Sequence, residues 1–385
     1  MVKIYLIAGE TSGDFIGGRL MQSLKDLYTL DGTAVKFEGV GGKNMQEAGL
    51  GVSLFPIEQI NLMGFVEIIP HIFAISKLID RTINDIVEQA PNLLITIDSP
   101  GFTYRVAKKV RQLIPKLKII HIVAPSVWAY KPSRALKYAK IYDYLLALLP
   151  FEPPYFQKVG LNCQYIGHPI IEQNFYDEQA KPALRQELNI ALNSKIISVT
   201  CGSRPGEIIK HIPVFMATLN MINLQYPNLE VIFVIANHRH QSLIESFLAK
   251  ATFNYRFSND RLKIFSIADV ALAKSGTNTL EITASGTPLV VAYKLNIVSF
   301  LLIKLLIKIP YISLINIIAN RKILPEFIQY NCTSDNLANS LITLMSDNKK
   351  ATEQVQDSRQ ILKKLYLHSS LSPSKLAANI IKSIF

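Results

Sequence analysis

Three short stretches of the 385-residue chain combine glycine with hydroxyl, carboxylate or guanidinium side chains, and each follows a strand-like run. The most cationic of them is "CGSR" at residues 201–204, which stands directly before a helix start. Gly202, the Ser203 hydroxyl, the planar Arg204 side chain and the N–H groups of the helix start would together bind a phosphate group. If no ligand binds here, the same residues would form only a capped helix beside an exposed arginine.

A second stretch, "SGTNTLE" at residues 275–281, places a carboxylate after a glycine loop. Ser275, Gly276 and Thr277 predict the loop and the helix start. Glu281 can then accept hydrogen bonds from two neighbouring ribose hydroxyls while the helix N-terminus faces a phosphate. A glutamate near a helix start also favours the helix dipole without any ligand. The recurrence of loop, helix and polar side chain favours a sugar-nucleotide site.

The third stretch, "GETSGD" at residues 9–14, follows the first strand-like run and carries two carboxylates. Its glycines permit positive φ angles and close backbone approach. The glycine spacing G-x3-G-x3-G does not match the dinucleotide fingerprint G-x-G-x-x-G. Glu38 lies where a ribose-binding acid would lie in a dinucleotide fold, but a dehydrogenase interpretation based on Glu38 fails on the glycine spacing. A tight turn with a helix cap from Ser12 or Asp14 is the interpretation without a ligand.

The elements that would hold these three stretches in place are strand-like runs that alternate with helical runs along the chain. The strand-like runs end in glycine, proline or polar residues, so functional residues are expected at the carboxyl ends of a parallel sheet. In the first part of the chain these runs span residues 4–8, 35–37, 93–97, 118–123 and 144–148. The regularity fails near Pro169–Pro182, where we place an interdomain linker, and a second cycle begins with "KIISVTCGSR".

The alternation predicts an α/β fold with two Rossmann-like domains that face a central cleft. The N-terminal domain is expected to span residues 1–172, and the C-terminal domain residues 173–360. Residues 361–385 are expected to form a helix that packs back on the N-terminal domain.

The composition and net charge of the chain limit the classes of partner that we expect. A formal net charge of +12 indicates polyanionic partners, such as nucleic acid, phosphorylated ligands or an anionic membrane surface. Nucleic acid is not expected, because the lysines are mostly scattered and form no basic stripe with interleaved aromatic residues. Three widely spaced cysteines and the lack of a basic-then-apolar leader fit a reducing cytosol. The sequence has no DxD pair, HExxH motif or Cys/His cluster, so no metal is expected.

A long apolar segment begins at Ile297 and reads "IVSFLLIKLLIKIPYISLINII". Lys304 and Lys308 lie within it and Pro310 interrupts it, so a membrane span is not expected. Apolar surface that also carries lysines suits a helix lying in an anionic membrane interface. A core helix with solvated lysines is the alternative. A second apolar segment, residues 63–79, is either an acyl-chain contact or core.

The order of the motifs along the chain resembles that of the lipid-A-disaccharide synthase family. The matching motifs are "AGETSGD", "DSPGF", "PSVWAY", "PFE", "IGHP", "GSR" and "SGTNTLE", which span essentially the whole chain. The chain departs from the family at Cys201, where proline is frequent, and at Tyr130, the second aromatic residue of a "WAW"-like stretch. The resemblance implies an inverting glycosyltransferase with the two-domain B-type fold.

The resemblance also implies a reaction, the transfer of 2,3-diacylglucosamine from UDP-2,3-diacylglucosamine to 2,3-diacylglucosamine 1-phosphate. Its products are the β-1,6-linked tetraacyl disaccharide 1-phosphate, a lipid A precursor, and UDP. Such an enzyme would work without a cofactor in the cytoplasm, at the anionic inner face of the bacterial inner membrane. A homodimer stays open. A UDP-sugar epimerase of the same architecture is the alternative function, although it would not explain the apolar, basic surface.

The family's motifs assign binding roles position by position. UDP would be held in the C-terminal domain by Gly202, Ser203, Arg204 and Glu281, beside the loop Ser275-Gly276-Thr277. Asn316 and Gln329 match polar positions that the family places at the cleft. The acceptor and the lipid chains would lie against the N-terminal domain, where residues 9–14 would contact sugar hydroxyls or orient their neighbours.

Catalytic roles follow from the needs of an inverting transfer. The acceptor hydroxyl needs a base, and the departing diphosphate needs charge stabilisation, which Arg204 would supply. Asp98 is the expected base because it ends a buried strand and is followed by a turn. A structural cap of that turn is the alternative role for Asp98, and Glu10 or Asp14 would then be the next candidates for the base.

Overall fold

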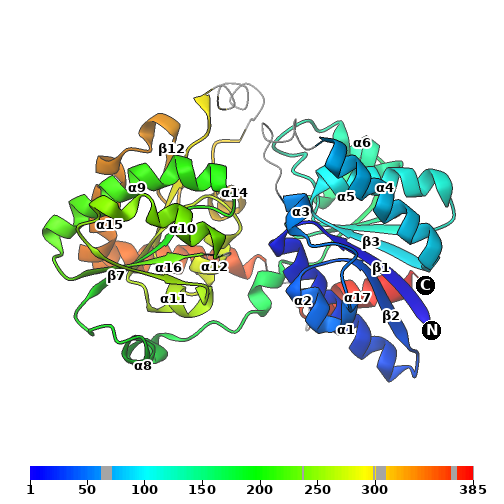
Figure 1. Cartoon of the computed structure of the whole chain (residues 1–385), viewed down its shortest axis with the longest axis horizontal. Coiled ribbons are helices and arrows are strands. Elements are labelled where there is room, and N and C mark those ends of the chain that lie inside the picture. The colour runs from blue at the N-terminus through cyan, green and yellow to red at the C-terminus, as the bar shows by residue number, and fades with distance from the viewer. Residues whose placement is uncertain (62–71, 236–237, 298–299, 301–308, 366–370, 385) are drawn as a thin grey trace. The chain divides into compact units, whose positions relative to one another are not determined.

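The computed structural model describes the chain except for residues 62–71, 236–237, 298–299, 301–308, 366–370 and 385 (Figure 1). The chain divides into two compact units. Unit 1 comprises Met1–Glu172 and Leu365–Phe385, and unit 2 comprises Gln173–Lys364. Each unit contains a six-stranded parallel sheet flanked by helices, so the predicted α/β fold with two Rossmann-like domains is confirmed.

In unit 1 the strands lie in the order β2-β1-β3-β4-β5-β6, and each pairing is parallel. The strands are β1 (Val2–Ala8), β2 (Val35–Val40), β3 (Leu93–Ile97), β4 (Lys118–Ile122), β5 (Tyr144–Ala147) and β6 (Asn162–Tyr165). The helices are α1 (Thr11–Leu30), α2 (Lys43–Met45), α3 (Glu58–Asn61), α4 (Ile72–Gln89), α5 (Pro100–Leu113), α6 (Arg134–Ala139), α7 (Pro153–Gln157) and α17 (Pro373–Ser383). The apolar run "LLITI" of β3 is buried along its whole length, as is typical of a strand covered on both faces.

Two layers of apolar side chains cover the faces of this sheet. One layer includes Ile83 of α4 and Val106 of α5. The other includes Leu20 of α1 and Ile381 of α17. Because α17 packs on α1, the end of the chain contributes to the core of unit 1, and Figure 1 shows these two helices side by side.

In unit 2 the strand order is β12-β11-β10-β7-β8-β9, again parallel throughout. The strands are β7 (Lys195–Thr200), β8 (Leu229–Val234), β9 (Asn254–Ser258), β10 (Val270–Lys274), β11 (Leu289–Tyr293) and β12 (Glu326–Ile328). The helices are α8 (Lys181–Glu187), α9 (Pro205–Gln225), α10 (Arg239–Glu245), α11 (Arg261–Ile267), α12 (Asn278–Ala284), α14 (Leu314–Ala319), α15 (Ser334–Ser346) and α16 (Asn348–Lys363). The central strands β7 and β10 carry the two glycine loops, so the register of this pair brings those loops to one edge.

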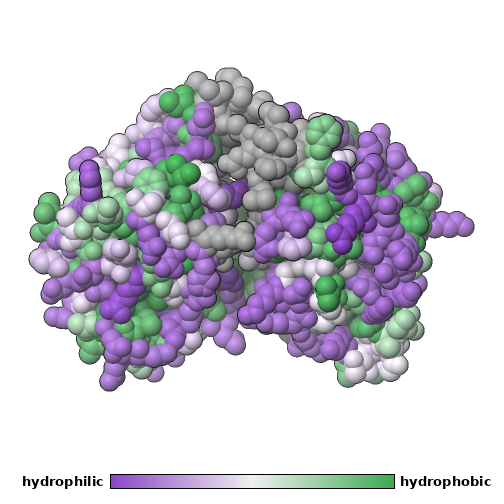
Figure 2. Space-filling model, in the orientation of Figure 1, coloured by the Kyte–Doolittle hydropathy of each residue, from purple (hydrophilic) through white to green (hydrophobic). Residues whose placement is uncertain are grey.

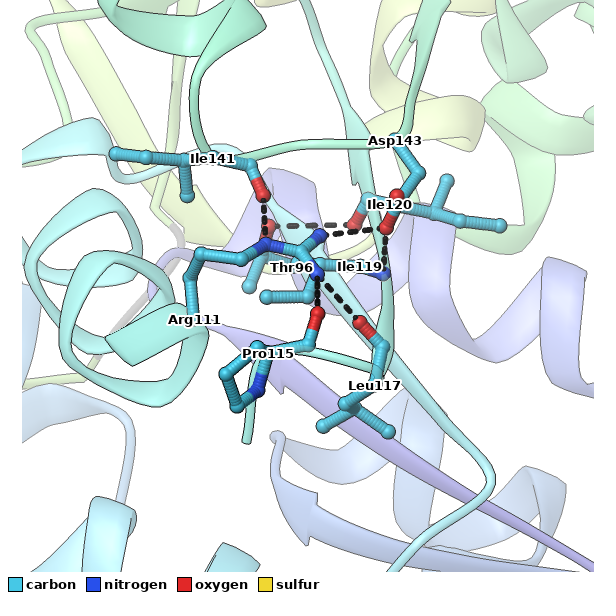
Figure 3. Close-up of polar contacts among 8 residues, drawn as sticks. All are labelled: Thr96, Arg111, Pro115, Leu117, Ile119, Ile120, Ile141 and Asp143. Carbon is cyan, nitrogen blue, oxygen red and sulfur yellow. Dashed lines mark hydrogen bonds and ion pairs between the residues drawn. The ribbon is translucent and has the colours of Figure 1, made fainter. Parts of the chain in front are cut away.

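An arginine fixes the amino ends of β4 and β5 in unit 1 (Figure 3). Arg111 of α5 donates a 2.6 Å hydrogen bond to Asp143 Oδ2, and the same oxygen accepts the Ile119 N–H at 2.8 Å. The guanidinium group also donates to three backbone carbonyl groups, those of Pro115, Leu117 and Ile141. This cluster lies at the amino edge of the sheet, whereas the predicted functional residues follow the carboxyl ends.

The strand expected over residues 118–123 ends one residue early. Val123 has a φ of 77°, a conformation that a β-branched residue rarely adopts and that cannot continue a strand. β4 therefore ends at Ile122.

The membrane predictions fall largely outside the described residues, which do not include Lys304, Lys308 or residues 62–71. None of the helices that the structure describes is long and apolar enough to cross a membrane. In the described part of the second apolar segment, Phe73 is 83% exposed, whereas Ile75 and Ile79 belong to the core. On the face drawn in Figure 2, the described apolar residues are scattered among hydrophilic ones.

Candidate functional site

The carboxyl edge of unit 2 brings both predicted anion-binding loops together. Ala273 of β10 pairs with Thr200 of β7, so residues 201–204 and 275–277 leave adjacent strands. The Asn278 side chain, at the start of α12, donates a 2.6 Å hydrogen bond to Thr200 Oγ1 and ties the second loop to the first strand. The two loops therefore lie close together at one edge of the unit 2 sheet.

Glu207, in the first turn of α9, organises the first loop. Its Oε2 accepts the Ser203 N–H at 3.0 Å, and its Oε1 lies 2.8 Å from Lys274 Nζ. Burial would raise the pKa of this carboxyl, but the Lys274 ion pair and the Ser203 hydrogen bond outweigh it, so the pKa is lowered. Glu207 is thus a carboxylate that links the ends of β7 and β10. No motif in the sequence indicates this role for Glu207.

Gly202 is required by this arrangement. Its φ is 128°, which only glycine adopts readily, and a Cβ placed there would lie 2.7 Å from Glu207 Cβ. Ser203, next in the chain, is exposed, and Arg204 is partly exposed in extended conformation at the N-cap of α9. Two polar side chains of the loop can therefore be reached by a ligand while the backbone between them is held by Glu207.

His211 connects α9 to the end of β11. The Lys294 N–H donates to His211 Nε2 at 2.9 Å, so Nδ1 carries the proton and donates to the Glu207 carbonyl oxygen at 2.7 Å. Burial lowers the pKa of His211 to about 4 and keeps the ring neutral. His211 therefore positions the start of α9 and is not available as a general base at neutral pH. A histidine four residues after Glu207 in a helix was the only sequence signal for this contact.

Glu281 is buried beside Arg261, a cation that no sequence motif indicated. Its Oε1 lies 2.9 Å from Arg261 Nε and accepts a 3.2 Å hydrogen bond from Gln173 Nε2. Burial raises the pKa of Glu281, and the positive charge of Arg261 partly offsets this effect. A ribose contact by this carboxylate stays a prediction.

Asn316 holds loops together. The completely buried side chain donates to Leu324 O and Glu326 Oε1, and its Oδ1 accepts the N–H groups of Ile323 and Leu324 at 2.8 Å each. An amide has two N–H groups and one oxygen with two lone pairs, so these four contacts use its full hydrogen-bonding capacity. The expectation of a cleft-facing Asn316 is corrected to a positioning role.

Gln329 and Ser275 also make contacts within unit 2. Gln329 exchanges hydrogen bonds of 3.0 and 3.2 Å with the N–H and carbonyl groups of Leu295, and its own φ is 51°. Ser275 donates its hydroxyl to Ile312 O at 3.0 Å. Both side chains fix neighbouring loops. Gly276 and Thr277 remain at the accessible part of the edge.

The carboxyl edge of unit 1 contains strained backbone. Asp98 and Ser99, which follow β3, have φ values of 53° and 47°, and Val123 after β4 has a positive φ as well. Asp98 Oδ1 accepts the Ser99 N–H at 2.7 Å, and Asp98 O accepts the Thr103 hydroxyl at 2.7 Å. A Cβ at Gly9, after the neighbouring strand β1, would overlap the Ser99 side chain. Strained positions that the surrounding structure enforces are concentrated at functional sites.

The two other carboxylates considered as bases differ in availability. Asp14 is buried and accepts four hydrogen bonds at 2.7–3.1 Å, from Gly42 N, Asn44 N, Asn44 Nδ2 and Met45 N. These contacts make Asp14 the cap of α2, so its expected catalytic role is corrected to a structural one. Glu10 is partly exposed in extended conformation before α1 and remains the alternative to Asp98.

A buried carboxyl group in the "PFE" motif was not identified as titratable from the sequence. Glu152 accepts the Leu149 N–H at 3.1 Å and the Trp128 Nε1–H at 3.2 Å. Burial raises its pKa to about 7, although both hydrogen bonds act in the opposite direction. His168, in "IGHP", accepts the Ile170 N–H through Nδ1 and thereby orders its own turn.

Comparisons with known proteins agree with the motif order. The family model described as Lipid-A-disaccharide synthetase matches residues 4–381. A protein of Rickettsia felis named Lipid-A-disaccharide synthase is 60% identical over 385 residues, which cover 100% of this chain and 97% of the relative. The Rickettsia prowazekii protein of the same name is 59% identical over 386 residues and is covered completely.

Solved structures share the fold at low identity. A Staphylococcus aureus structure titled MnaA-UDP co-structure has a TM-score of 0.66 at 14% identity and covers 100% of this chain and 97% of its own. The glycotransferase of kitacinnamycin has a TM-score of 0.61 at 15% identity, with 99% and 98% coverage. A Listeria monocytogenes structure titled putative UDP-N-acetylglucosamine 2-epimerase has a TM-score of 0.64 at 12% identity, with 99% and 94% coverage. At these identities the likeness extends to the fold alone.

Proposed function

The chain belongs to the lipid-A-disaccharide synthase family and is a glycosyltransferase of lipid A biosynthesis, and from that premise we propose its specific reaction. The substrates are a UDP-sugar and a lipid acceptor. The donor is UDP-2,3-diacylglucosamine and the acceptor 2,3-diacylglucosamine 1-phosphate. The acceptor 6-hydroxyl oxygen attacks C1 of the donor sugar, the bond from C1 to the phosphate oxygen breaks, and UDP leaves with the electron pair. Inversion at C1 gives the β-1,6 linkage.

The observation that carries this proposal is the identity of about 60% to lipid-A-disaccharide synthases over the whole length of the chain. The geometry of unit 2 supports it, because two glycine loops, the Ser203 hydroxyl and Arg204 gather at one sheet edge. In the proposed reaction these groups hold the diphosphate, and Arg204 stabilises the negative charge that develops on the leaving UDP.

Asp98 is the proposed base that takes the proton of the acceptor hydroxyl. Support comes from its place after β3 and from the strained backbone of Asp98 and Ser99. One of its carboxylate oxygens is engaged by the Ser99 N–H, which fixes the orientation of the group. A base must lie within hydrogen-bond reach of the proton it accepts, so fixed orientation favours this role.

Metal-independent transfer is part of the proposal. In the part of the chain that the structure describes, no three His, Cys, Asp or Glu side chains form a group that could hold a metal ion. Arg204 and the loop N–H groups would supply the charge stabilisation that a divalent cation supplies elsewhere. Full activity in the presence of a chelator such as EDTA is the expected result.

We also place the enzyme in the cytoplasm, on the anionic inner face of the inner membrane, because its proposed substrates carry acyl chains. The basic composition supports this location, and the segment with Lys304 and Lys308 is the proposed contact. The protein should sediment with anionic vesicles, and glutamate at both lysines should reduce sedimentation. Undiminished binding by that double variant would move the contact elsewhere. A homodimer stays a prediction.

Acceptor dependence tests the proposed reaction against the epimerase alternative. The purified protein is incubated with UDP-2,3-diacylglucosamine, with and without 2,3-diacylglucosamine 1-phosphate. We expect UDP to be released only with the acceptor, in equal amount to the disaccharide. Formation of the 2-epimer without the acceptor would instead identify an epimerase.

A further inference from the structure

Lys274 is a second cationic side chain at the carboxyl edge of unit 2, in addition to Arg204. It is the last residue of β10, immediately before the loop 275–277. Its Nζ lies 2.8 Å from Glu207 Oε1 and 5.6 Å from the centroid of the Tyr293 ring. A Cβ placed at Gly276 would lie 3.9 Å from the same nitrogen. The ammonium group is therefore at the level of the second loop.

The carboxylate of Glu207 joins this ammonium group to the first loop. One of its oxygens accepts from Lys274 and the other accepts the Ser203 N–H. A backbone N–H and an ammonium group on one anion are also the donors that phosphate oxygens take in proteins. We propose that Lys274 is a further diphosphate-binding residue of the donor site, held beside the 202–203 loop by Glu207. This inference rests on the proposed function, because UDP is the ligand that supplies the diphosphate.

The charges at this edge explain why diphosphate binding would need Lys274. Arg204 and Glu207 alone sum to zero, whereas with Lys274 the three side chains sum to +1. Without the lysine, the Glu207 carboxylate would repel an incoming diphosphate. An ammonium group has three N–H donors, and the ion pair with one Glu207 oxygen uses one of them. Another N–H can therefore donate to a phosphate oxygen at the same time.

A purely structural role for Lys274 makes a different prediction. If the ion pair served only to join the ends of β7 and β10, its loss would also disturb the loop 275–277 and the predicted ribose contact of Glu281 in α12, so uridine and UDP would both bind more weakly. A direct phosphate contact instead affects ligands according to their phosphates. Uridine, UMP and UDP separate the two roles because they differ only in the number of phosphate groups.

Isothermal titration of the full-length protein with these three ligands is the test. The wild type should bind UDP more tightly than uridine. Lys274→Met, which keeps the length of the side chain but removes its charge, should lower UDP affinity about 10-fold or more, as expected for a charge-assisted hydrogen bond. The affinity for uridine should not change, and Lys274→Arg should recover most of the loss for UDP.

Lys263 provides a matched control. Its side chain is 16% exposed and its Nζ lies 2.8 Å from Glu187 Oε1, compared with 15% and 2.8 Å for Lys274 and Glu207. Lys263→Met should leave the affinity for all three ligands unchanged. If Lys274→Met does not fold, as judged by circular dichroism, Lys274→Gln takes its place in the same comparison.

Three outcomes would overturn the inference. Equal losses for uridine and UDP would make Lys274 structural, and an unchanged UDP affinity would remove it from the site. In both cases the wild type would still prefer UDP, so the proposed function would stand. A wild-type protein that binds UDP no more tightly than uridine would overturn the proposed diphosphate site itself.

Discussion

The two units use similar contacts at the amino edges of their sheets and different ones at the carboxyl edges. In unit 1, Asp143 precedes β5 and accepts hydrogen bonds from Arg111 and from the Ile119 N–H of β4 (Figure 3). In unit 2, Asp269 precedes β10 and accepts hydrogen bonds from Arg185 at 3.0 Å and from the N–H of Ile196 in β7 at 2.7 Å. Arg185, like Arg111, also donates to backbone carbonyl groups.

The carboxyl edges differ in conformation and charge. Unit 1 has left-handed backbone at Asp98 and Ser99, and the Asp98 carboxylate is the proposed base. Unit 2 has two glycine loops beside Arg204 and Lys274, which suit an anion. The contacts at the amino edges stabilise the fold, whereas the proposed reaction assigns proton transfer to one carboxyl edge and diphosphate binding to the other. Ligands generally bind at the carboxyl ends of strands in doubly wound sheets. Substitutions at the two kinds of edge should therefore have separable effects.

The largest effect is expected at the carboxyl edge of unit 1. Asp98→Asn should lower kcat by about 10²–10⁴-fold, because an amide cannot take the acceptor proton. The fold should persist, since asparagine retains the oxygen that accepts the Ser99 N–H and tolerates left-handed backbone. Steady-state kinetics on both substrates measure the change.

Asp80→Asn is the control for this prediction, because Asp80 is an exposed carboxylate paired with Lys109. Near-normal turnover of Asp98→Asn would make Asp98 the cap of its turn. Glu10→Gln would then be the variant to examine for loss of the base.

The next effect is expected at the carboxyl edge of unit 2. Arg204→Ala should lower kcat by about 10²–10³-fold, the range for removal of a preorganised donor to developing charge. The affinity for UDP should fall as well. Arg256→Ala, at an exposed arginine paired with Glu230, should leave both quantities unchanged. Wild-type kinetics in a folded Arg204→Ala variant would remove Arg204 from the site.

A pH-dependent loss of stability is expected from Glu152 in unit 1. Its pKa is raised from 4.5 to about 7 in the folded state, so the folded state binds the proton more tightly than the unfolded state. Stability should therefore fall as the pH rises from about 5 to 8, by about 3 kcal/mol from this group. Urea unfolding of the wild type and Glu152→Gln at several pH values measures the difference in slope. Parallel pH dependence in the two proteins would refute it.

The smallest effect is expected at the amino edges and falls on stability alone. Arg111→Ala and Arg185→Ala should each lower the free energy of unfolding by about 2 kcal/mol, because charged hydrogen bonds and several carbonyl partners are lost. UDP affinity should not change. Lys109→Ala breaks an exposed ion pair and should cost about 0.5 kcal/mol or less. A loss of UDP affinity in Arg185→Ala would contradict the separation of the edges.

Local patterns in the sequence were enough to predict the fold class and the sheet edge at which the candidate site lies. Apolar runs that end in glycine loops predict parallel strands, and the carboxyl ends of such strands gather at one edge. The loops 201–204 and 275–277 both lie at this edge of the unit 2 sheet. The early end of β4 at Ile122 was not predictable, because an apolar valine at residue 123 fits a strand by its type.

Contacts between distant loops could not be predicted from the same patterns. Glu207 and Lys274 come together only because β7 and β10 are neighbours, and no local spacing records that pairing. The Asp14 carboxylate likewise accepts hydrogen bonds from a loop about 30 residues further along the chain. Asn316 had the polarity expected of a ligand contact, and only its four partners in the structure assign it to loop packing.

Parallel measurement of UDP affinity and turnover in Asp98→Asn and Arg204→Ala tests the separation of roles most directly. We predict that Asp98→Asn retains wild-type UDP affinity while turnover falls, and that Arg204→Ala loses both. Loss of UDP affinity in Asp98→Asn to the same extent as in Arg204→Ala would contradict the assignment of proton transfer to one carboxyl edge and diphosphate binding to the other.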